Sequence, residues 1–98
     1  MEITKELKGT AATIALEGRL DTTTAPQFEA ELKTVTDGIT DLVLDFEKLV
    51  YVSSAGLRVI LSAQKTMNKQ GNMKICHVSP DIMEVFEITG FSDILTIE

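Results

Sequence analysis

The stretch Tyr51-Val52-Ser53-Ser54-Ala55-Gly56-Leu57-Arg58 lies where the chain changes from one periodicity to another. Before it, Leu49 to Val52 is apolar and β-branched, which is typical of a strand. After it, from Ala55 to Gln70, apolar residues recur on one face at helical spacing. The members of that face are Leu57, Ile60, Leu61 and Met67. The stretch therefore predicts a strand that ends at a serine pair and a helix that begins there.

Upstream of this junction the sequence predicts a hairpin, a helix and a short strand. Ile3–Lys8 and Ala11–Gly18 alternate apolar and polar residues on either side of Gly9-Thr10, which indicates an antiparallel hairpin. The capping cluster Thr22-Thr23-Thr24 and Pro26 begin a helix that runs to about residue 36, with Phe28, Leu32 and Val35 as its apolar stripe. Leu42-Val43-Leu44 is a buried strand, and a turn is expected near Glu47-Lys48.

Downstream, strands and helices continue to alternate. Met73–Val78 is a strand, Ser79-Pro80 begins a short helix that Gly90 ends, and Ile94–Ile97 is the last strand. The order β-β-α-β-α-β-α-β predicts an α/β fold in one domain, residues 1–98. We expect a mixed β-sheet with an antiparallel N-terminal hairpin at its edge and helices packed on the sheet.

Composition excludes several classes of function. The 98 residues include 9 basic and 15 acidic side chains, a net charge of −6, which disfavours binding to nucleic acid or to an anionic membrane surface. Apolar runs are far shorter than the roughly 20 residues of a membrane span, and the charged start lacks a signal-peptide core. One cysteine allows no internal disulfide and suits a reducing compartment. We expect a cytoplasmic protein with no direct nucleic-acid partner; the oligomeric state is not indicated.

Motifs for catalysis or metal binding are missing. The chain has one histidine, no G-x-S-x-G elbow and no glycine-rich phosphate loop, so no catalytic residue, enzymatic activity or cofactor is predicted. Cys76 and His77 are adjacent in an expected strand, where their side chains point to opposite faces. On a regular strand they cannot share a metal ion, and we expect a buried thiol beside a surface imidazole.

The serine pair is the exception to this lack of chemistry. One serine suffices as an N-cap, so the second hydroxyl is spare. Ala55 and Gly56 have almost no side chain and are expected to leave the backbone N–H groups open. Because a helix N-terminus carries about half a positive charge, a phosphoryl group could be accepted there without unfolding the helix.

The sequence around this junction resembles a known family. Asp45-Phe46-Glu47-Lys48-Leu49-Val50-Tyr51-Val52-Ser53-Ser54-Ala55-Gly56-Leu57-Arg58-Val59 is similar to the signature of the STAS domain of bacterial anti-sigma factor antagonists. Gly18-Arg19-Leu20-Asp21 resembles an early turn of that family, and Ser79-Pro80 and Ile88-Thr89-Gly90-Phe91 match later landmarks. The resemblance extends over nearly the whole chain.

The resemblance implies partner switching. Such an antagonist binds an anti-sigma factor that is also a serine kinase and thereby frees a sigma factor; the kinase then phosphorylates the antagonist, and a serine phosphatase resets it. The acceptor position falls on Ser54. Ser53 is the alternative acceptor, because it stands where the family commonly has an aspartate, and Ala55 replaces a common serine or threonine. The expected partner-binding residues are Asp21, Thr22, Ser53, Ser54, Ala55, Gly56 and Arg58.

Other interpretations remain open at this point. The chain is alternatively a STAS scaffold that binds without being phosphorylated, as in transport or sensory assemblies, or a small nucleotide-binding or hydrolytic α/β protein. Asp21 is equally a turn or helix-capping carboxylate. Arg58 is either a solvated first-turn cation or a partner for a phosphate on Ser54.

Overall fold

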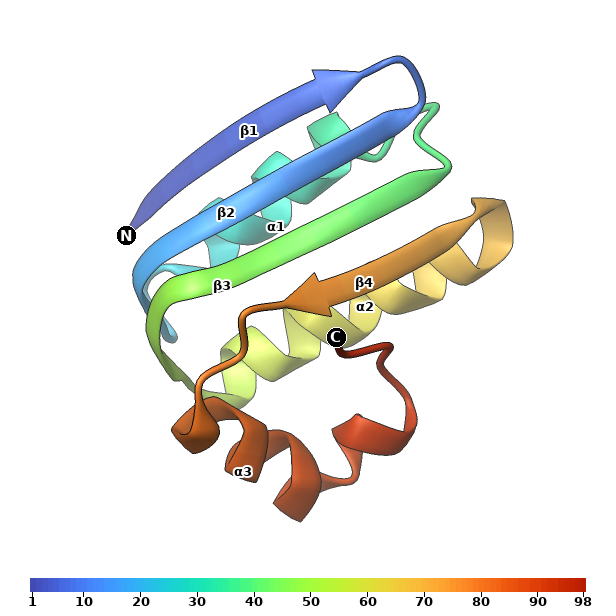
Figure 1. Ribbon diagram of the computed structural model, residues 1–98. Helices are drawn as coiled ribbons and strands as arrows, with labels where there is room; N and C mark the ends of the chain where they lie inside the picture. The colour runs from blue at the N-terminus through green and yellow to red at the C-terminus, as the bar shows by residue number, and fades with distance from the viewer.

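The computed structural model describes all residues, 1–98, and is built on a four-stranded sheet (Figure 1). The strands lie side by side in the order in which they occur in the chain. In chain order the elements are β1 (Glu2–Lys8), β2 (Ala11–Leu20), α1 (Ala25–Val35), β3 (Asp41–Val52), α2 (Ser54–Gln70), β4 (Asn72–Cys76), α3 (Pro80–Thr89) and a 3₁₀ turn (Phe91–Asp93).

The sheet is mixed, and its antiparallel part is the predicted hairpin. Strand β1 pairs with β2 antiparallel, and the connection passes through Gly9, whose positive φ of 59° suits glycine. Strands β2, β3 and β4 are parallel to one another, so each connection between them must cross over through a helix. The predicted α/β class with an antiparallel N-terminal edge is confirmed.

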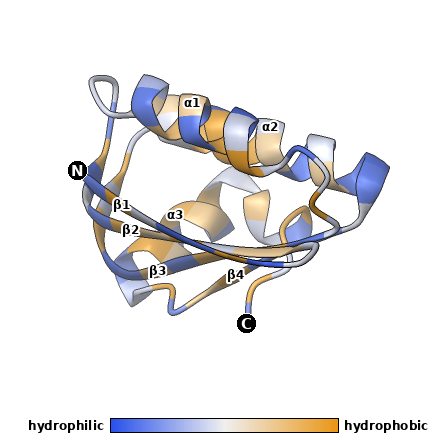
Figure 2. Ribbon diagram, turned by 90° about the horizontal axis from the view of Figure 1, so that it is seen from above, coloured by the Kyte–Doolittle hydropathy of each residue, from blue (hydrophilic) through white to orange (hydrophobic).

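Helices α1 and α2 cover the same face of the sheet (Figure 2), and the opposite face, toward the viewer in Figure 1, carries neither of them. The predicted stripe of α1 is buried, and so are Leu57, Ile60 and Met67 of α2. Leu61, however, is only half-buried. Helix α2 instead buries Val59 and Ala63, which together with Leu32 line a crevice between the two helices. Its apolar surface is therefore divided between the sheet and α1.

Strand β3 differs from the prediction, because the expected turn at Glu47-Lys48 does not interrupt it. The strand runs unbroken for 12 residues. Its pairing with β2 shifts between Ala15–Asp45 and Glu17–Lys48, so two residues of β3 lie opposite one residue of β2. A bulge of this kind absorbs extra residues without ending the strand. The two exposed charged residues mark the bulge and not a turn.

The C-terminal segment also differs from the prediction. Gly90 takes a left-handed conformation with φ 81° and leads into the 3₁₀ turn, which uses residues expected before a strand. Only Ile97 then pairs, in a single parallel bridge to Ile75 of β4. The bridge is held by the Ile75 N–H donating to the Thr96 carbonyl and the Glu98 N–H donating to the Ile75 carbonyl, both at 2.9 Å. The predicted strand Ile94–Ile97 is thus reduced to one bridge.

Candidate functional site

Strands β2 and β3 end at the same edge of the sheet. Their last residues, Leu20 and Val52, are register partners. The Ser53 N–H donates to the Leu20 carbonyl oxygen at 2.9 Å, which ties the start of one loop to the end of the neighbouring strand. In open sheets the carboxyl ends of parallel strands are where binding sites usually form. The residues predicted to bind a partner directly follow these two strands in the chain and therefore lie at this edge.

The two serines of the junction have different roles. Ser53 is the N-cap of α2, and its Oγ accepts a hydrogen bond from the Gly56 N–H at 3.4 Å. Ser54 is the first helical residue; its side chain is exposed and makes no hydrogen bond within the chain. The backbone N–H groups of Ser54 and Ala55 also lack partners, as expected in a first helical turn. A spare hydroxyl and free donors therefore lie together.

Gly56 does not have the open surroundings that its sequence position suggested. It is buried, and its N–H is occupied by Ser53 Oγ. A Cβ atom placed on it would lie 2.6 Å from Leu20 Cγ and 3.1 Å from the Leu20 carbonyl oxygen. Glycine is required here because α2 begins in direct contact with the end of β2. The exposed surface at this junction is consequently formed by neighbours of Gly56, such as Ser54, and not by Gly56 itself.

Asp21 organises the loop between β2 and α1. Its Oδ1 accepts from the Thr23 hydroxyl at 2.7 Å and from the Thr23 and Thr24 backbone N–H groups at 3.0 and 3.2 Å. The hydrogen bond from the Thr23 hydroxyl, supported by the two N–H groups, lowers the pKa of the Asp21 carboxyl. The turn-forming role left open by the sequence is therefore real, and Thr24, the N-cap, makes no side-chain capping bond of its own.

An open groove of about 370 Å³ lies between the starts of α1 and α2. Thr22 lines it from one side, and Ala55 and Arg58 line it from the other. Arg58 is exposed and forms no ion pair. It follows Ser54 by four residues, which places the two side chains on the same face of the helix. Among the residues predicted to bind a partner, Thr22, Ser54 and Arg58 are the exposed ones.

A cation and an aromatic ring that the sequence did not predict also lie at this edge of the sheet. The Arg19 guanidinium lies 4.1 Å from the centroid of the Tyr51 ring, and the two residues are register partners on β2 and β3. Val50, next to Tyr51, is 67% exposed. No pattern in the sequence indicates this exposure, because Leu49–Val52 is apolar throughout and the consecutive exposed residues Val50 and Tyr51 coincide with a second register shift, between Gly18 and Arg19 of β2.

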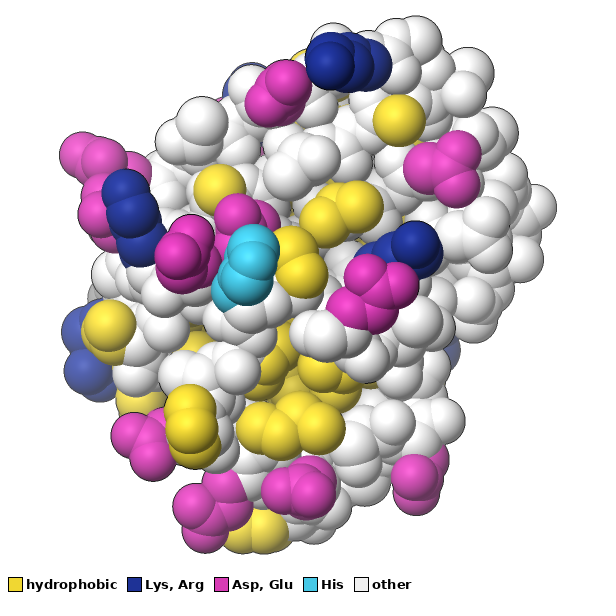
Figure 3. Space-filling view, viewed as in Figure 1, with side chains coloured by type: hydrophobic (Ala, Val, Ile, Leu, Met, Phe, Trp, Pro, Cys, Tyr) yellow, Lys and Arg dark blue, Asp and Glu magenta, His cyan; other side chains and the backbone are white.

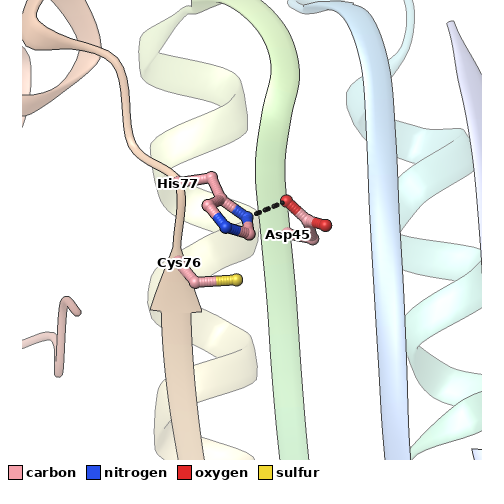
Figure 4. Close-up of side chains that lie close together, drawn as sticks. All are labelled: Asp45, Cys76 and His77. Carbon is pink, nitrogen blue, oxygen red and sulfur yellow. Dashed lines mark hydrogen bonds and ion pairs between the residues drawn. The ribbon is translucent and has the colours of Figure 1, made fainter.

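A separate cluster lies on the open face of the sheet (Figure 4). Strand β4 ends at Cys76, and His77 has a positive φ of 58°, so the predicted regular strand through both residues is wrong. The backbone turn brings the imidazole to the same side as the thiol, and His77 Nδ1 lies 2.9 Å from Asp45 Oδ1. One ligand atom each from Asp45, Cys76 and His77 lies within 4.8 Å of the others. Figure 3 shows the histidine, in cyan, beside acidic side chains on this face.

The charges of this cluster influence one another. The hydrogen bond to Asp45 raises the pKa of His77. Burial works against ionisation of Asp45, but the bonds from His77 and the Glu47 N–H outweigh it and lower the pKa of the carboxyl. Burial, with the nearby carboxylates of Asp45 and Glu98, raises the pKa of the Cys76 thiol. The cluster is an imidazole–carboxylate pair beside a protonated thiol.

Fold and site together define a small α/β domain with a mixed sheet and a serine-capped helix that begins at the carboxyl end of a parallel strand. None of its helices is both long and apolar enough to cross a membrane. The family model of the STAS domain matches residues 2–98, and the chain belongs to this family.

Two relatives of this chain have names that describe anti-sigma factor antagonists. The chain is 43% identical over 84 residues to BtrV of Bordetella bronchiseptica, a proposed anti-sigma factor antagonist, and the match covers 84% of this chain and 72% of that protein. It is 32% identical over 84 residues to the anti-sigma-B factor antagonist of Staphylococcus aureus, covering 84% and 78%.

A solved structure with the same fold exists in two chemical states. The unphosphorylated anti-sigma factor antagonist SpoIIAA is 22% identical and superposes with a TM-score of 0.78 over 99% of this chain and 87% of its own. The phosphorylated form of SpoIIAA, a Bacillus cell fate determinant, gives a TM-score of 0.77 at 22% identity, over 99% of this chain and 91% of its own.

Proposed function

We propose that this protein is an anti-sigma factor antagonist that works by partner switching. It binds an anti-sigma factor serine kinase in the cytoplasm and so releases a sigma factor, and phosphorylation of Ser54 ends the interaction until a serine phosphatase removes the phosphate. It catalyses no reaction itself. The names of its relatives support the class of function. The observation that carries the site is the exposed, unbonded hydroxyl of Ser54 beside a serine that already caps the helix.

A phosphate on Ser54 is compatible with the fold. It would add about −1.5 to −2 charges at neutral pH close to the unpartnered N–H groups of the first turn of α2. The partial positive charge of a helix N-terminus stabilises an anion in that place. Helix α2 has no acidic residue in its first turn that would repel the phosphate, and Arg58 is free to pair with it. The phosphorylated chain should therefore stay folded.

Binding to the partner should be weakened by the same phosphate. The partner surface meets Ser54 as a small hydroxyl, next in the chain to Ala55, which lines the groove together with Thr22 and Arg58. A dianion there would lose its hydration on contact unless the partner supplied a cation. A tenfold loss of affinity requires only about 1.4 kcal/mol. One phosphate of this kind is sufficient for that effect.

The remaining contacts of the interface come from the neighbouring loop and strand ends. Asp21 holds the loop that presents Thr22, and Arg19 with Tyr51 offers a stacked cation and ring at the same edge. Aromatic and arginine side chains are the residues that most often dominate protein interfaces. The net charge of −6 favours a partner whose docking surface is basic.

The test uses the anti-sigma factor kinase encoded in the same genome as this protein. The purified chain is incubated with that kinase and ATP, and the modified residue is located by mass spectrometry. We expect phosphate on Ser54 in the unaltered chain and in Ser53→Ala, and none in Ser54→Ala. Calorimetry should show that Ser54→Ala binds like the unaltered chain, whereas Ser54→Asp binds about tenfold more weakly or worse.

The control is the fold of each variant, which circular dichroism should show to be native-like. Phosphate on Ser53 would move the acceptor by one residue and contradict the role given to Ser54. Tight binding to a kinase that modifies neither serine would favour a scaffold that is not phosphorylated. Failure to bind any anti-sigma factor of that genome would overturn the proposed function itself.

A further inference from the structure

Asp45, Cys76 and His77 lie on the open face of the sheet, away from the serine junction, and the proposed function uses none of them. Asp45 and Cys76 are register partners on parallel strands, so their side chains project from the same face. His77 would face the other way in a continuing strand, but its left-handed backbone returns the ring to that face. Three different ligand types thus converge from the carboxyl end of β4 and the middle of β3.

We propose that these three side chains form a binding site for one divalent transition-metal ion, with Zn²⁺ as the ion that fits their chemistry. The fourth position would be open to water or to another ligand. This site is independent of the partner-binding edge and of the phosphorylation of Ser54.

The donor set decides the class of metal. A thiolate and an imidazole are the ligands that Zn²⁺ and neighbouring transition metals prefer, whereas Mg²⁺ and Ca²⁺ require oxygen ligands. A carboxylate completes many zinc sites as a third ligand. Three protein ligands with an open position are the arrangement of zinc sites that remain reactive.

The geometry needs only a small adjustment. Ligand atoms on one tetrahedral zinc ion, at bond lengths of about 2.0–2.3 Å, lie roughly 3.3–3.8 Å apart. Here the three atoms lie within 4.8 Å of one another, and the closest pair, Asp45 Oδ1 and His77 Nδ1, is 2.9 Å apart. Entry of an ion would separate that pair slightly and draw the others inward. Rotation about side-chain bonds can supply movements of this size.

The surroundings favour a cation and hold one ligand in place. Asp45 lines an open groove of about 350 Å³ in which Glu2, Glu17 and Glu47 outnumber the single cationic residue, Lys48. The Glu47 N–H donates to Asp45 Oδ1 at 3.0 Å, which orients the carboxylate as second-layer hydrogen bonds do in metal sites. The His77 side chain is 58% exposed, so an ion can reach the site directly from solvent.

Binding would change the protonation of the cluster. Cys76 would lose its thiol proton to solvent and bind as a thiolate, and His77 would bind as the neutral imidazole. The ion would then link the end of β4 to the middle of β3 by bonds that the metal-free chain lacks. Metal binding is therefore expected to raise the melting temperature of the protein.

Cobalt titration tests the site, because the chain contains one cysteine and one histidine. The full chain, reduced and freed of metal by a chelator, is titrated with Co²⁺ and followed by absorption spectroscopy. A thiolate-to-cobalt charge-transfer band can come only from Cys76. We expect this band, its loss in Cys76→Ser, and its displacement by Zn²⁺ but not by Mg²⁺.

Two variants and a matched control establish the other ligands. His77→Gln and Asp45→Asn should weaken Co²⁺ binding by about tenfold or more. Asp41→Asn removes the same charge from the same strand, at a register pair distant from the cluster, and should leave the affinity nearly unchanged. In the unaltered chain, Zn²⁺ should shift the ring-proton resonances of His77.

The proposal is overturned if Co²⁺ gives no charge-transfer band, or if Zn²⁺ leaves the His77 resonances in place. A band that persists unchanged in His77→Gln and Asp45→Asn would show a lone thiol and not a site. Equal weakening by Asp41→Asn would show that general negative charge, and not coordination, attracts the ion.

Discussion

Helices α2 and α3 begin alike and differ in the residues that follow. Each follows a strand of the parallel part of the sheet and has a serine N-cap, whose Oγ accepts from a backbone N–H three residues later, at 3.4 Å from Gly56 and 3.3 Å from Ile82. In α3 the next residues are Pro80 and Asp81, so an acidic side chain already complements the helix dipole. In α2 no acidic residue lies in the first turn.

The difference shows that capping a helix start and leaving that start accessible to an anion are separate properties. The serine cap stabilises both helices, but only α2 leaves its positive end without a negative charge and places an exposed hydroxyl beside it. The third helical residue differs as well: Ile82 is buried as a side chain, whereas Gly56 lets the backbone itself contact Leu20. Two helix starts with the same capping residue therefore differ in whether an acidic side chain already balances the helix dipole.

The largest effect is expected from Gly56→Ala. The added methyl group would approach Leu20 too closely, and overpacking of this kind costs about 1–3 kcal/mol of the free energy of unfolding. Urea denaturation measures the loss. A double-mutant cycle with Leu20→Ala is the control, because removing the opposing side chain should make the two losses less than additive. Strict additivity would mean that the close approach to Leu20 is not what requires glycine.

The serine caps should contribute equally to stability. Ser53→Ala and Ser79→Ala each remove one capping bond of similar length, and each should lower the free energy of unfolding by about 1 kcal/mol. Ser54→Ala removes a hydroxyl that bonds nothing in the chain and should change stability by less than about 0.5 kcal/mol. Denaturant midpoints would contradict the division of roles if Ser54→Ala cost as much as Ser53→Ala.

The smallest effect concerns charge in the first turn. Ser54→Asp should stabilise α2 by about 0.3–1 kcal/mol at low salt, and Asp81→Asn should destabilise α3 by a similar amount. Both changes should shrink when thermal unfolding is repeated at high salt, because ions screen exposed charges. If Ser54→Asp lowers the melting temperature, then the start of α2 does not stabilise an anion, and the contrast with α3 is wrong.

The serine junction could be predicted from sequence because helix capping is a local property. The residue types that start and end helices act within a few positions, and Ser53 and Ser79 both lie where their side chains cap. The burial of Gly56 was not predictable in this way. It depends on contact with Leu20 on another strand, which only the assembled sheet reveals.

The other differences between the sequence-based predictions and the structure have similar causes. Strand β3 continues past Glu47-Lys48 because its pairing with β2 admits a bulge, which is a property of the pair and not of either strand. His77 departs from the expected strand through a positive φ, a conformation that is uncommon outside glycine even though histidine adopts it more often than most residues. The convergence of Asp45, Cys76 and His77 was consequently invisible before the structure.

The order of the strands has a consequence for how the protein forms. Because β1, β2, β3 and β4 occupy the sheet in the order of the chain, each strand pairs with the one just before it. The β1–β2 hairpin joins residues that are close in sequence, whereas each parallel pair, such as Ala11 with Asp41 and Asp41 with Asn72, is separated by one crossover helix. No pairing therefore has to close a loop longer than one strand–helix unit. Local contacts are associated with fast folding and parallel pairings with slower folding, so the hairpin is expected to form before the parallel strands join it. A chain leaving the ribosome can add each new strand to a sheet edge that already exists, before the following strand has been made.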